Sequence, residues 1–209
     1  MTPGEFELFE ALLWEPAAGY FLLERHLARL AASASHFAFA CDPAAVRARL
    51  ALFAEGLPGE PRKVRLELSR DGSVFLEHVD LKPSTLVQLP LACDPVDSRD
   101  EFLRHKTSRR AVYDAALRAR PGASDVLLWN ERGELTETCA GNVVLELDGR
   151  RVTPRADSGL LPGTFRAELL ERGEIAEAVV PLKALERASR LFFVNSVRRW
   201  CPLAVTDGS

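Results

Sequence analysis

The pattern of hydrophobic and polar residues predicts alternating strands and helices along the whole chain. Alternation with a period of two marks strands, whereas apolar residues spaced three and four apart mark helices that bury one face. In the first half, the pattern predicts helices at 24–37 and 43–55 and extended segments at 6–14, 20–23, 62–69, 73–79 and 85–89. In the second half, it predicts helices at 109–119, 162–171 and 182–187 and strands at 125–129, 143–147, 175–180 and 191–194.

Aspartate, proline and glycine residues set several of these boundaries. Asp42 suits a helix N-cap and Pro43 the first helical turn. The dipeptides at 71–72 and 148–149 are both Asp-Gly and each predicts a hairpin turn. The polar, proline-containing stretch 93–98 is expected to be a linker, which gives an N-terminal α+β domain at 1–94 and a C-terminal domain at 95–209. Mixed strands and helices in both halves favour an α+β protein of two small domains.

Composition and charge exclude several classes of function. The chain of 209 residues is long enough to bury a sizeable core, and its net charge of −3, with basic residues scattered among acidic ones, argues against a nucleic-acid partner. The four cysteines are far apart and lack metal-ligand spacing, so we expect reduced thiols and no metal site. A secretory signal and an apolar run long enough to span a bilayer are both missing from the sequence, which favours a soluble, cytoplasmic protein without membrane contact.

Lysine is rare in this chain, which makes Lys106 a candidate for amine chemistry. Only four of the 27 basic residues are lysines, and the others are arginines. Arginine keeps its proton under nearly all conditions, whereas lysine can lose a proton, act as a base or condense with a carbonyl. Scarcity alone is better explained by base composition, in which case Lys106 is one more surface cation.

Glu137 is a second candidate. It lies in the stretch 135–142 on a connection between strands, where small residues separate it from the amide of Asn142. Taken alone, this carboxylate is better explained as a solvated residue.

Two turns and one arginine suit an anion. The loop 158–166 contains glycines and runs into a helix, and the amides at a helix N-terminus point toward a bound phosphate. The tight turn 195–198 offers a hydroxyl and amides to the same anion. Arg29 lies off the apolar stripe of its helix, and a guanidinium can grip phosphate in two-pronged geometry. Many such helices and arginines have nothing bound, and the turn is equally well an ordinary one.

Several other catalytic motifs are missing from the sequence. It has no Gly-x-Ser-x-Gly, its four histidines form no triad pattern, and it has neither a dinucleotide fingerprint nor a Walker loop. His26 is expected to lie on a helix surface rather than to act as a ligand. A serine hydrolase or nucleotide-binding function is therefore not favoured.

In their order along the chain, these segments resemble the class IV aminotransferases, the fold-type IV family of pyridoxal-phosphate (PLP) enzymes. The likeness is greatest to the aminodeoxychorismate lyase branch, including forms fused behind a para-aminobenzoate synthase component. It covers nearly the whole chain from about Phe6, and the matching stretches are 21–30, 105–110 with 113–114, 130–137 with Asn142, 159–166 and 195–198. The resemblance implies a D-amino-acid aminotransferase-like fold with a small N-terminal α/β domain and a C-terminal mixed-sheet pseudo-barrel domain that carries the PLP lysine.

The resemblance also implies roles for individual residues. Lys106 would form a Schiff base with PLP and carry protons. Glu137 would pair with the pyridinium nitrogen, so that the ring acts as an electron sink. Asn142 would brace the Glu137 stretch, Tyr113 would reach the cofactor or substrate, and Arg198 would contact the substrate. The residues implied to hold the phosphate are Arg29, Thr164, Phe165, Ser196 and Val197.

The implied reaction converts the small molecule 4-amino-4-deoxychorismate into pyruvate and 4-aminobenzoate, a folate precursor. One alternative is transamination of D- or branched-chain amino acids in the same scaffold. A second is a non-catalytic relative that assembles with a chorismate-aminating synthase component. A homodimer is expected from the family.

Two residues depart from the family pattern. Arg199 stands where the lyase branch often has glycine, and this change could alter the mouth of the site. Phe165 stands where many relatives have threonine, so one hydroxyl for the phosphate would be missing.

Overall fold

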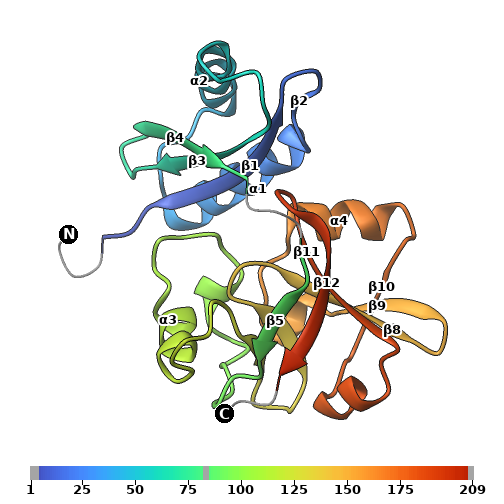
Figure 1. The fold of residues 1–209 in the computed structure, drawn as a ribbon. Helices are drawn as coiled ribbons and strands as arrows, with labels where there is room; N and C mark the ends of the chain where they lie inside the picture. Colours follow the sequence, from blue (N-terminus) through green and yellow to red (C-terminus); the bar gives the residue numbers. More distant parts are fainter. Residues whose placement is uncertain (1–4, 82–84, 207–209) are drawn as a thin grey trace. The chain divides into compact units, whose positions relative to one another are not determined.

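The computed structural model describes residues 5–81 and 85–206, and the chain divides into two compact units (Figure 1). The first unit consists of Met1–Pro83 and His105–Arg109. The second consists of Ser84–Arg104 and Arg110–Ser209. This division differs from the predicted boundary at residue 94, and it assigns Lys106 to the first unit rather than to the C-terminal domain.

The stretch 93–98, predicted as a linker, packs within the second unit instead. The amide of Ala92 donates to the carbonyl of Leu127 over 2.8 Å, and the amide of Val96 donates to the carbonyl of Trp129 over 2.8 Å. Ser98 donates its amide and its hydroxyl to the carboxylate of Glu131, over 2.9 and 2.7 Å. A polar, proline-containing segment can therefore run beside a strand and satisfy its backbone groups there, which composition alone does not reveal.

The first unit is an antiparallel sheet with two helices packed on one face. The sheet order is β2-β1-β3-β4, and the alternate residues Leu8 and Leu12 of β1 face the helices, where Leu27 and Leu50 contribute to one apolar core. The Asp42 side chain accepts a hydrogen bond from the amide of Ala44 over 2.9 Å, which confirms the predicted helix start. The elements are β1 (Leu8–Glu15), β2 (Gly19–Tyr20), α1 (Leu23–Phe37), α2 (Pro43–Glu55), β3 (Arg62–Leu68) and β4 (Val74–Asp80).

The second unit is built on a mixed sheet whose described strands follow the order β10-β9-β8-β11-β12-β5, with β7 pairing β8 and β6 pairing β7. The pairs β9–β10 and β12–β5 are parallel and the others antiparallel, and the sheet is nearly closed, which confirms the predicted pseudo-barrel. Its strands are β5 (Val87–Pro90), β6 (Leu127–Trp129), β7 (Leu135–Thr138), β8 (Asn142–Leu147), β9 (Arg150–Pro154), β10 (Ala176–Ala178), β11 (Arg190–Asn195) and β12 (Arg199–Thr206). Its helices are α3 (Ala111–Arg118), α4 (Thr164–Glu171) and the short 3-10 turns Glu101–Leu103, Ala156–Ser158 and Leu182–Glu186.

Two strands of this sheet were not predicted. All four residues of β7 are buried, so the segment lacks the alternation that marks a half-buried strand. Strand β12 contains Pro202, a residue that normally argues against a strand because it cannot donate to the ladder. The Asp148-Gly149 hairpin is present between β8 and β9, as predicted.

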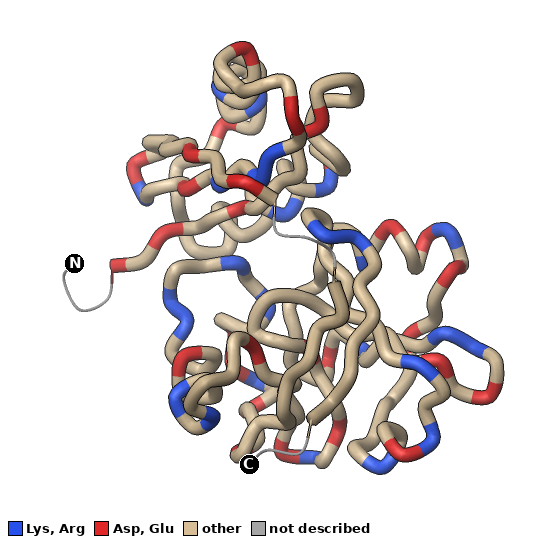
Figure 2. The backbone as a smooth tube through the Cα atoms, viewed as in Figure 1, with Lys and Arg blue, Asp and Glu red and all other residues tan. Residues whose placement is uncertain are grey.

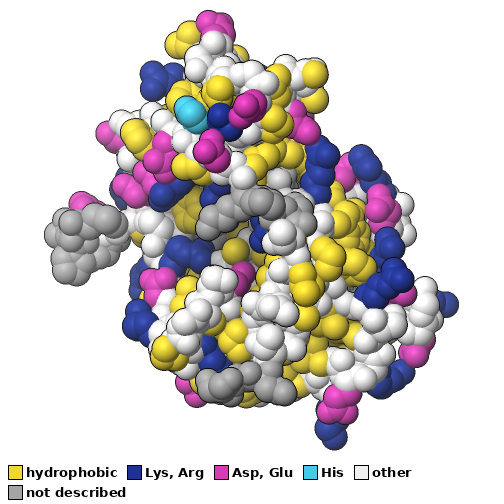
Figure 3. Space-filling view, in the orientation of Figure 1, with side chains coloured by type: hydrophobic (Ala, Val, Ile, Leu, Met, Phe, Trp, Pro, Cys, Tyr) yellow, Lys and Arg dark blue, Asp and Glu magenta, His cyan; other side chains and the backbone are white. Residues whose placement is uncertain are grey.

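Charges of both signs are distributed over each unit. Lys and Arg residues are interspersed with Asp and Glu along the backbone (Figure 2), and one face of the molecule shows apolar side chains between charges of both signs (Figure 3). No helix of the described residues is long and apolar enough to cross a membrane. Within the same residues, no group of histidine, cysteine and acidic side chains could hold a metal ion. The four cysteines are free thiols.

Candidate functional site

The predicted site residues are divided between the two units. Arg29 and Lys106 belong to the first unit. The others belong to the second, namely Tyr113, Glu137, Asn142, Thr164, Phe165, Ser196, Val197 and Arg198.

Lys106 is held in the first unit by backbone pairing with the start of β1. The amide of Phe9 donates to the carbonyl of Lys106 over 3.0 Å, and the amide of Ser108 donates to the carbonyl of Glu7 over 2.8 Å. The Ser108 hydroxyl in turn accepts from the amide of Glu7 over 2.9 Å. The Lys106 amine lies 4.5 Å from the centroid of the Phe9 ring. These bonds fix the segment around Lys106, including the lysine backbone, along the start of β1.

His105, next to Lys106, is packed against the C-terminal half of α1. Its Nδ1 lies 3.0 Å from the Ser33 hydroxyl, and its ring stacks on His36 with centroids 4.4 Å apart. The Phe37 ring meets the same imidazole edge-on at 4.8 Å. These contacts attach the lysine segment to the helix that carries Arg29.

Arg29 forms a two-pronged ion pair with Glu10 of β1. Its Nε donates to Glu10 Oε1 over 2.8 Å, and its Nη2 donates to Glu10 Oε2 over 2.6 Å. His26 Nδ1 lies 2.7 Å from the same Oε2. Burial by itself raises the pKa of Glu10, but Arg29 and His26 outweigh it and lower the pKa from 4.5 to about 2. The carboxylate is therefore ionised at neutral pH.

The prediction that His26 lies on a helix surface is wrong, because its side chain is only 1% exposed. Glu10 is only 2% exposed, and we did not identify it from the sequence. Two signals were available. Glu10 occupies an inward position of β1 between Leu8 and Leu12, and His26 and Arg29 are three residues apart on one helix and so share a face.

In the second unit, Glu137 of β7 is a buried carboxylate, 2% exposed, that accepts hydrogen bonds from neutral groups. Its Oε1 accepts from the Tyr113 hydroxyl over 2.8 Å and from the Leu161 amide over 3.0 Å. Its Oε2 accepts a longer bond from Asn142 Nδ2 over 3.3 Å. Hydrogen bonds of this kind favour the charged form of a carboxyl group and offset part of the free-energy cost of burial.

Tyr113 is fixed as a donor to Glu137. Burial, followed by the nearby charge of Glu137, raises the pKa of Tyr113 well above its ordinary value of 10.0, so the phenol keeps its proton. The Arg110 guanidinium lies 4.4 Å over the Tyr113 ring and donates to the carbonyl of Cys139 over 2.6 Å. The sequence did not indicate this contact between the Tyr113 hydroxyl and Glu137.

Asn142 connects Glu137 to the loop before α4. Its Nδ2 donates to the Leu161 carbonyl over 2.8 Å as well as to Glu137, and Asn142 pairs with Glu137 across the β7–β8 ladder. A Cβ at Gly163 would lie 2.1 Å from Asn142 Oδ1, far inside van der Waals contact. Glycine is therefore required at 163 for Asn142 to reach both partners.

The predicted phosphate-binding residues of α4 lie at its first turn. Gly163 is the N-cap residue and brings no side chain to the first amides of the helix. Thr164 and Phe165 are both buried. The Phe165 ring packs edge-on toward Trp200, with centroids 6.3 Å apart, so at this position only the backbone has a polar group to offer.

The predicted turn after β11 is present, with Asn195 at its start. Asn195 Oδ1 accepts from the amide of Val197 over 3.0 Å and from the amide of Arg198 over 2.7 Å. The Val197 amide, predicted to face a phosphate, is thus used within the turn. Ser196, the second residue of the turn, is buried.

Arg198 and Arg199 have different environments. The Arg198 guanidinium lies 5.4 Å over the Phe193 ring and donates to the carbonyl of Thr85 over 3.4 Å. Arg199 has a φ of 57°, in the left-handed region that favours glycine. The glycine that the resemblance to the lyase branch leads us to expect at this position would adopt this φ without steric cost.

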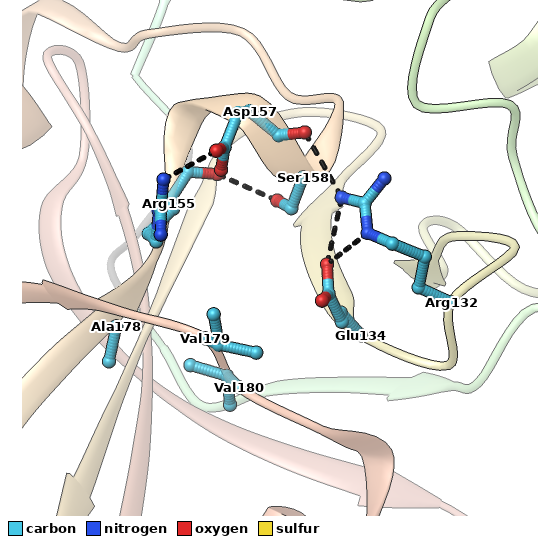
Figure 4. Close-up of a pocket in the computed structure, with 8 residues that line it drawn as sticks. All are labelled: Arg132, Glu134, Arg155, Asp157, Ser158, Ala178, Val179 and Val180. Carbon is cyan, nitrogen blue, oxygen red and sulfur yellow. Dashed lines mark hydrogen bonds and ion pairs between the residues drawn. The ribbon is translucent and has the colours of Figure 1, made fainter.

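A pocket of about 180 Å³ opens elsewhere in the second unit (Figure 4). Its four charged side chains pair among themselves, Arg132 with Glu134 at 2.8 Å and Arg155 with Asp157 at 2.6 Å. None of the predicted site residues lines this pocket. The remaining lining residues are Ser158, Ala178, Val179 and Val180.

The chemistry of these groups fits PLP. PLP requires an amine to bind its carbonyl carbon, a carboxylate to hold a proton on its ring nitrogen, and donors for its phosphate. Lys106 supplies an amine on a fixed backbone, and Glu137 supplies a carboxylate already oriented by three donors. Arg29 supplies an oriented cation.

The chain is similar to known proteins along almost its entire length. A family model described as amino-transferase class IV matches residues 7–205. A Schizosaccharomyces pombe protein named "Putative aminodeoxychorismate lyase" is 31% identical over 207 residues, covering 94% of this chain and 88% of that protein.

Two solved structures extend the comparison. A "Putative amino-acid aminotransferase" from Mesorhizobium loti is 39% identical with a TM-score of 0.89, covering 97% of this chain and 100% of that one. The 4-amino-4-deoxychorismate lyase from Pseudomonas aeruginosa is 27% identical with a TM-score of 0.81, covering 96% of this chain and 83% of that one. The similar proteins are therefore named for two activities, a lyase and an aminotransferase.

Proposed function

The chain belongs to the class IV aminotransferase family of PLP-dependent enzymes, and on this basis we propose that it is a 4-amino-4-deoxychorismate lyase. The observation that carries the proposal is the 31% identity, across 94% of the chain, to a relative named for that activity. The solved lyase with a TM-score of 0.81 supports it.

In this proposal Lys106 performs two tasks. Its amine would hold PLP at the carbonyl carbon, and the same amine, when free, would carry protons to and from the substrate. The reaction needs both directions of proton transfer, because the ring of the substrate loses a proton while the departing enolpyruvyl group gains one. The products 4-aminobenzoate and pyruvate together contain all the atoms of the substrate, so the reaction needs no oxidant or added water.

Glu137 would hold a proton on the ring nitrogen of PLP. When bound, PLP withdraws electrons from the bonds next to the substrate nitrogen, and it does so best with that nitrogen protonated. An amide at 137 could not support the positive charge. Tyr113 and Asn142, which donate to Glu137 over 2.8 and 3.3 Å, would fix its orientation.

Arg29 and the amides and hydroxyls at Thr164, Phe165, Ser196 and Val197 would hold the phosphate. The Val197 amide donates to Asn195 over 3.0 Å, so its part in phosphate binding would require this turn to change or share the bond. We therefore expect Arg29 and the first turn of α4 to contribute most.

The first experiment tests cofactor attachment. Purified protein is mixed with PLP, its visible spectrum is recorded, the complex is reduced with borohydride, and the modified lysine is located by mass spectrometry. Modification of Lys106 in the wild type, its loss in Lys106→Ala and its retention in Lys183→Ala are expected. Lys183 is a matched control because it is an exposed lysine in the same chain.

The second experiment tests the reaction. The loaded protein is supplied with 4-amino-4-deoxychorismate, and 4-aminobenzoate and pyruvate are measured. Equal amounts of both products are expected. Full PLP loading on Lys106 without either product would rule out the lyase while leaving the cofactor assignment in place.

The second candidate is an amino-acid aminotransferase, favoured by the 39% identity and TM-score of 0.89 to the Mesorhizobium loti protein. It predicts that D- or branched-chain amino acids and a keto acid exchange the amino group without elimination. Formation of a new amino acid from a keto acceptor, without pyruvate release from aminodeoxychorismate, would decide for this activity.

A further inference from the structure

Glu10 is an acidic residue at a position built for an apolar one. It lies on the inward face of β1 between Leu8 and Leu12, which are both core residues, and only 2% of its side chain is exposed. Burying a charged carboxylate in such a place costs free energy, and a well-packed apolar residue usually serves stability as well or better. The acid at this position therefore calls for a reason beyond the core itself.

The contact with Arg29 fixes the plane of the guanidinium. Glu10 receives Nε and Nη2, the side edge of the group, at 2.8 and 2.6 Å. The end edge, formed by Nη1 and Nη2, therefore faces away from the carboxylate. An end edge, like the side edge, can meet two oxygens of a phosphate in a two-pronged contact.

His26 fixes the carboxylate from a second direction. Its Nδ1 lies 2.7 Å from Glu10 Oε2, and an ionised carboxylate can only accept, so this nitrogen carries the hydrogen. His26 and Arg29 come from one helix and Glu10 from the strand beneath it. The three side chains thus form one connected set of contacts that includes the Arg29 guanidinium, which is 13% exposed.

We propose that Glu10 is a positioning residue that orients Arg29 for the phosphate of PLP, with His26 holding Glu10 in place. The inference rests on the proposed function, because it requires PLP to be the ligand and Arg29 to hold its phosphate. Its physical basis is preorganisation. A long arginine side chain that is already immobile loses less conformational entropy when it binds an anion.

The test compares PLP with pyridoxal, which has the same ring and aldehyde but no phosphate. Dissociation constants for both are measured by spectral titration of the wild type, Glu10→Gln and Glu24→Gln. Glu24 is the matched control, since it is a carboxylate of α1 paired with an arginine, Arg47, at 2.6 Å, but fully on the surface.

For Glu10→Gln we expect PLP affinity to fall about tenfold to hundredfold, the size of losing a charge-assisted hydrogen bond. Pyridoxal affinity should change less than about twofold, which lies within ordinary context effects for a distant contact. In an Arg29→Ala background, Glu10→Gln should have no further effect on PLP binding, because the two residues act in series. Glu24→Gln should match the wild type for both ligands.

Equal weakening of PLP and pyridoxal would overturn the proposal, since it would mean that Glu10 supports only the fold. Unchanged PLP affinity in Glu10→Gln would overturn it as well. If Glu10→Gln does not fold, Glu10→Asp replaces it. Glu10→Asp keeps the charge but shifts the Arg29 guanidinium, so we still expect a loss of affinity for PLP and not for pyridoxal. Equal losses of affinity for the two ligands would again overturn the proposal. Failure of the wild type to bind PLP would instead refute the proposed function, and this inference with it.

Discussion

The hydroxyl of Tyr113, on α3, donates a 2.8 Å hydrogen bond to Oε1 of Glu137, on β7. Both side chains are buried, and burial together with the Glu137 charge keeps the pKa of Tyr113 well above its ordinary value. The pair therefore consists of a permanent donor and an acceptor fixed in direction. This relationship links α3 to the carboxylate proposed to hold the PLP ring nitrogen.

Replacement of Tyr113 by phenylalanine should weaken both stability and the site. Glu137 would lose one of its donors in a buried environment, a change that costs about 1–3 kcal/mol in the free energy of unfolding. Urea unfolding measures this cost, and the visible spectrum of the PLP complex reports the site. Tyr20→Phe is the control, because the Tyr20 hydroxyl donates to the Leu50 carbonyl over 3.0 Å in the first unit. Tyr20→Phe should lower the free energy of unfolding without changing the visible spectrum of the PLP complex. The same spectral change in Tyr20→Phe and Tyr113→Phe would count against the positioning role of Tyr113.

Replacement of Glu137 by glutamine should reduce turnover by about a hundredfold or more, the size expected for removing a preorganised charge from an active site. Glutamine keeps the shape but cannot hold a proton on a pyridine nitrogen. The measurement is single-turnover kinetics together with the spectrum of the bound cofactor. Glu134→Gln, which removes a carboxylate paired with Arg132 at 2.8 Å, should retain activity. Wild-type turnover in Glu137→Gln would exclude the assigned role.

Replacement of Gly163 by alanine should disturb Asn142. The new Cβ would lie 2.1 Å from Asn142 Oδ1, and the Asn142 side chain is held by its bonds to Glu137 and Leu161. Overpacking of this kind costs about 1–3 kcal/mol, and PLP affinity should fall with it. Gly59→Ala is the control, since a Cβ there meets nothing within 4 Å. Equal stability and PLP affinity in the two variants would show that Asn142 can move away without consequence.

Acid should remove the stabilisation provided by Glu10. Its pKa in the folded protein is about 2, against an ordinary value of 4.5, so the contribution is complete above pH 4.5 and is lost as the pH falls toward 2. The difference in pKa corresponds to about 3 kcal/mol. Comparing the free energy of unfolding of the wild type and Glu10→Gln between pH 7 and pH 2 isolates this contribution. The two curves should converge as the pH falls, and parallel curves would contradict the low pKa.

Replacement of Arg199 by glycine should stabilise the protein by about 1 kcal/mol, because glycine adopts a φ of 57° without the steric cost that arginine pays there. Thermal unfolding gives the change. Arg199→Ala separates backbone from side chain, since it removes the guanidinium but keeps the Cβ, and it should give no such gain. If alanine stabilised as much as glycine, the effect would belong to the side chain.

The sequence by itself determined most of the elements, because their signals are local. The hydrophobic periodicity located α1, and the turn residues located the start of α2 and both hairpins. Those signals failed for β7, which is buried throughout, and for β12, which contains Pro202. The order of the motifs along the chain also indicated the family. The roles given to Lys106 and Glu137 remain predictions for the experiments above.

Only the tertiary structure decided which side chains meet. It placed the segment of Lys106 beside β1, with the Ser108 hydroxyl bonded to the amide of Glu7, 101 residues away. It also buried His26 and paired Glu10 with Arg29, where the sequence showed a surface histidine and a lone helical arginine. Local periodicity tells which face of an element is buried, but not which other element covers it. Contacts between distant residues depend on how the whole chain packs, and that arrangement gives Arg29 its orientation and Glu137 its donors.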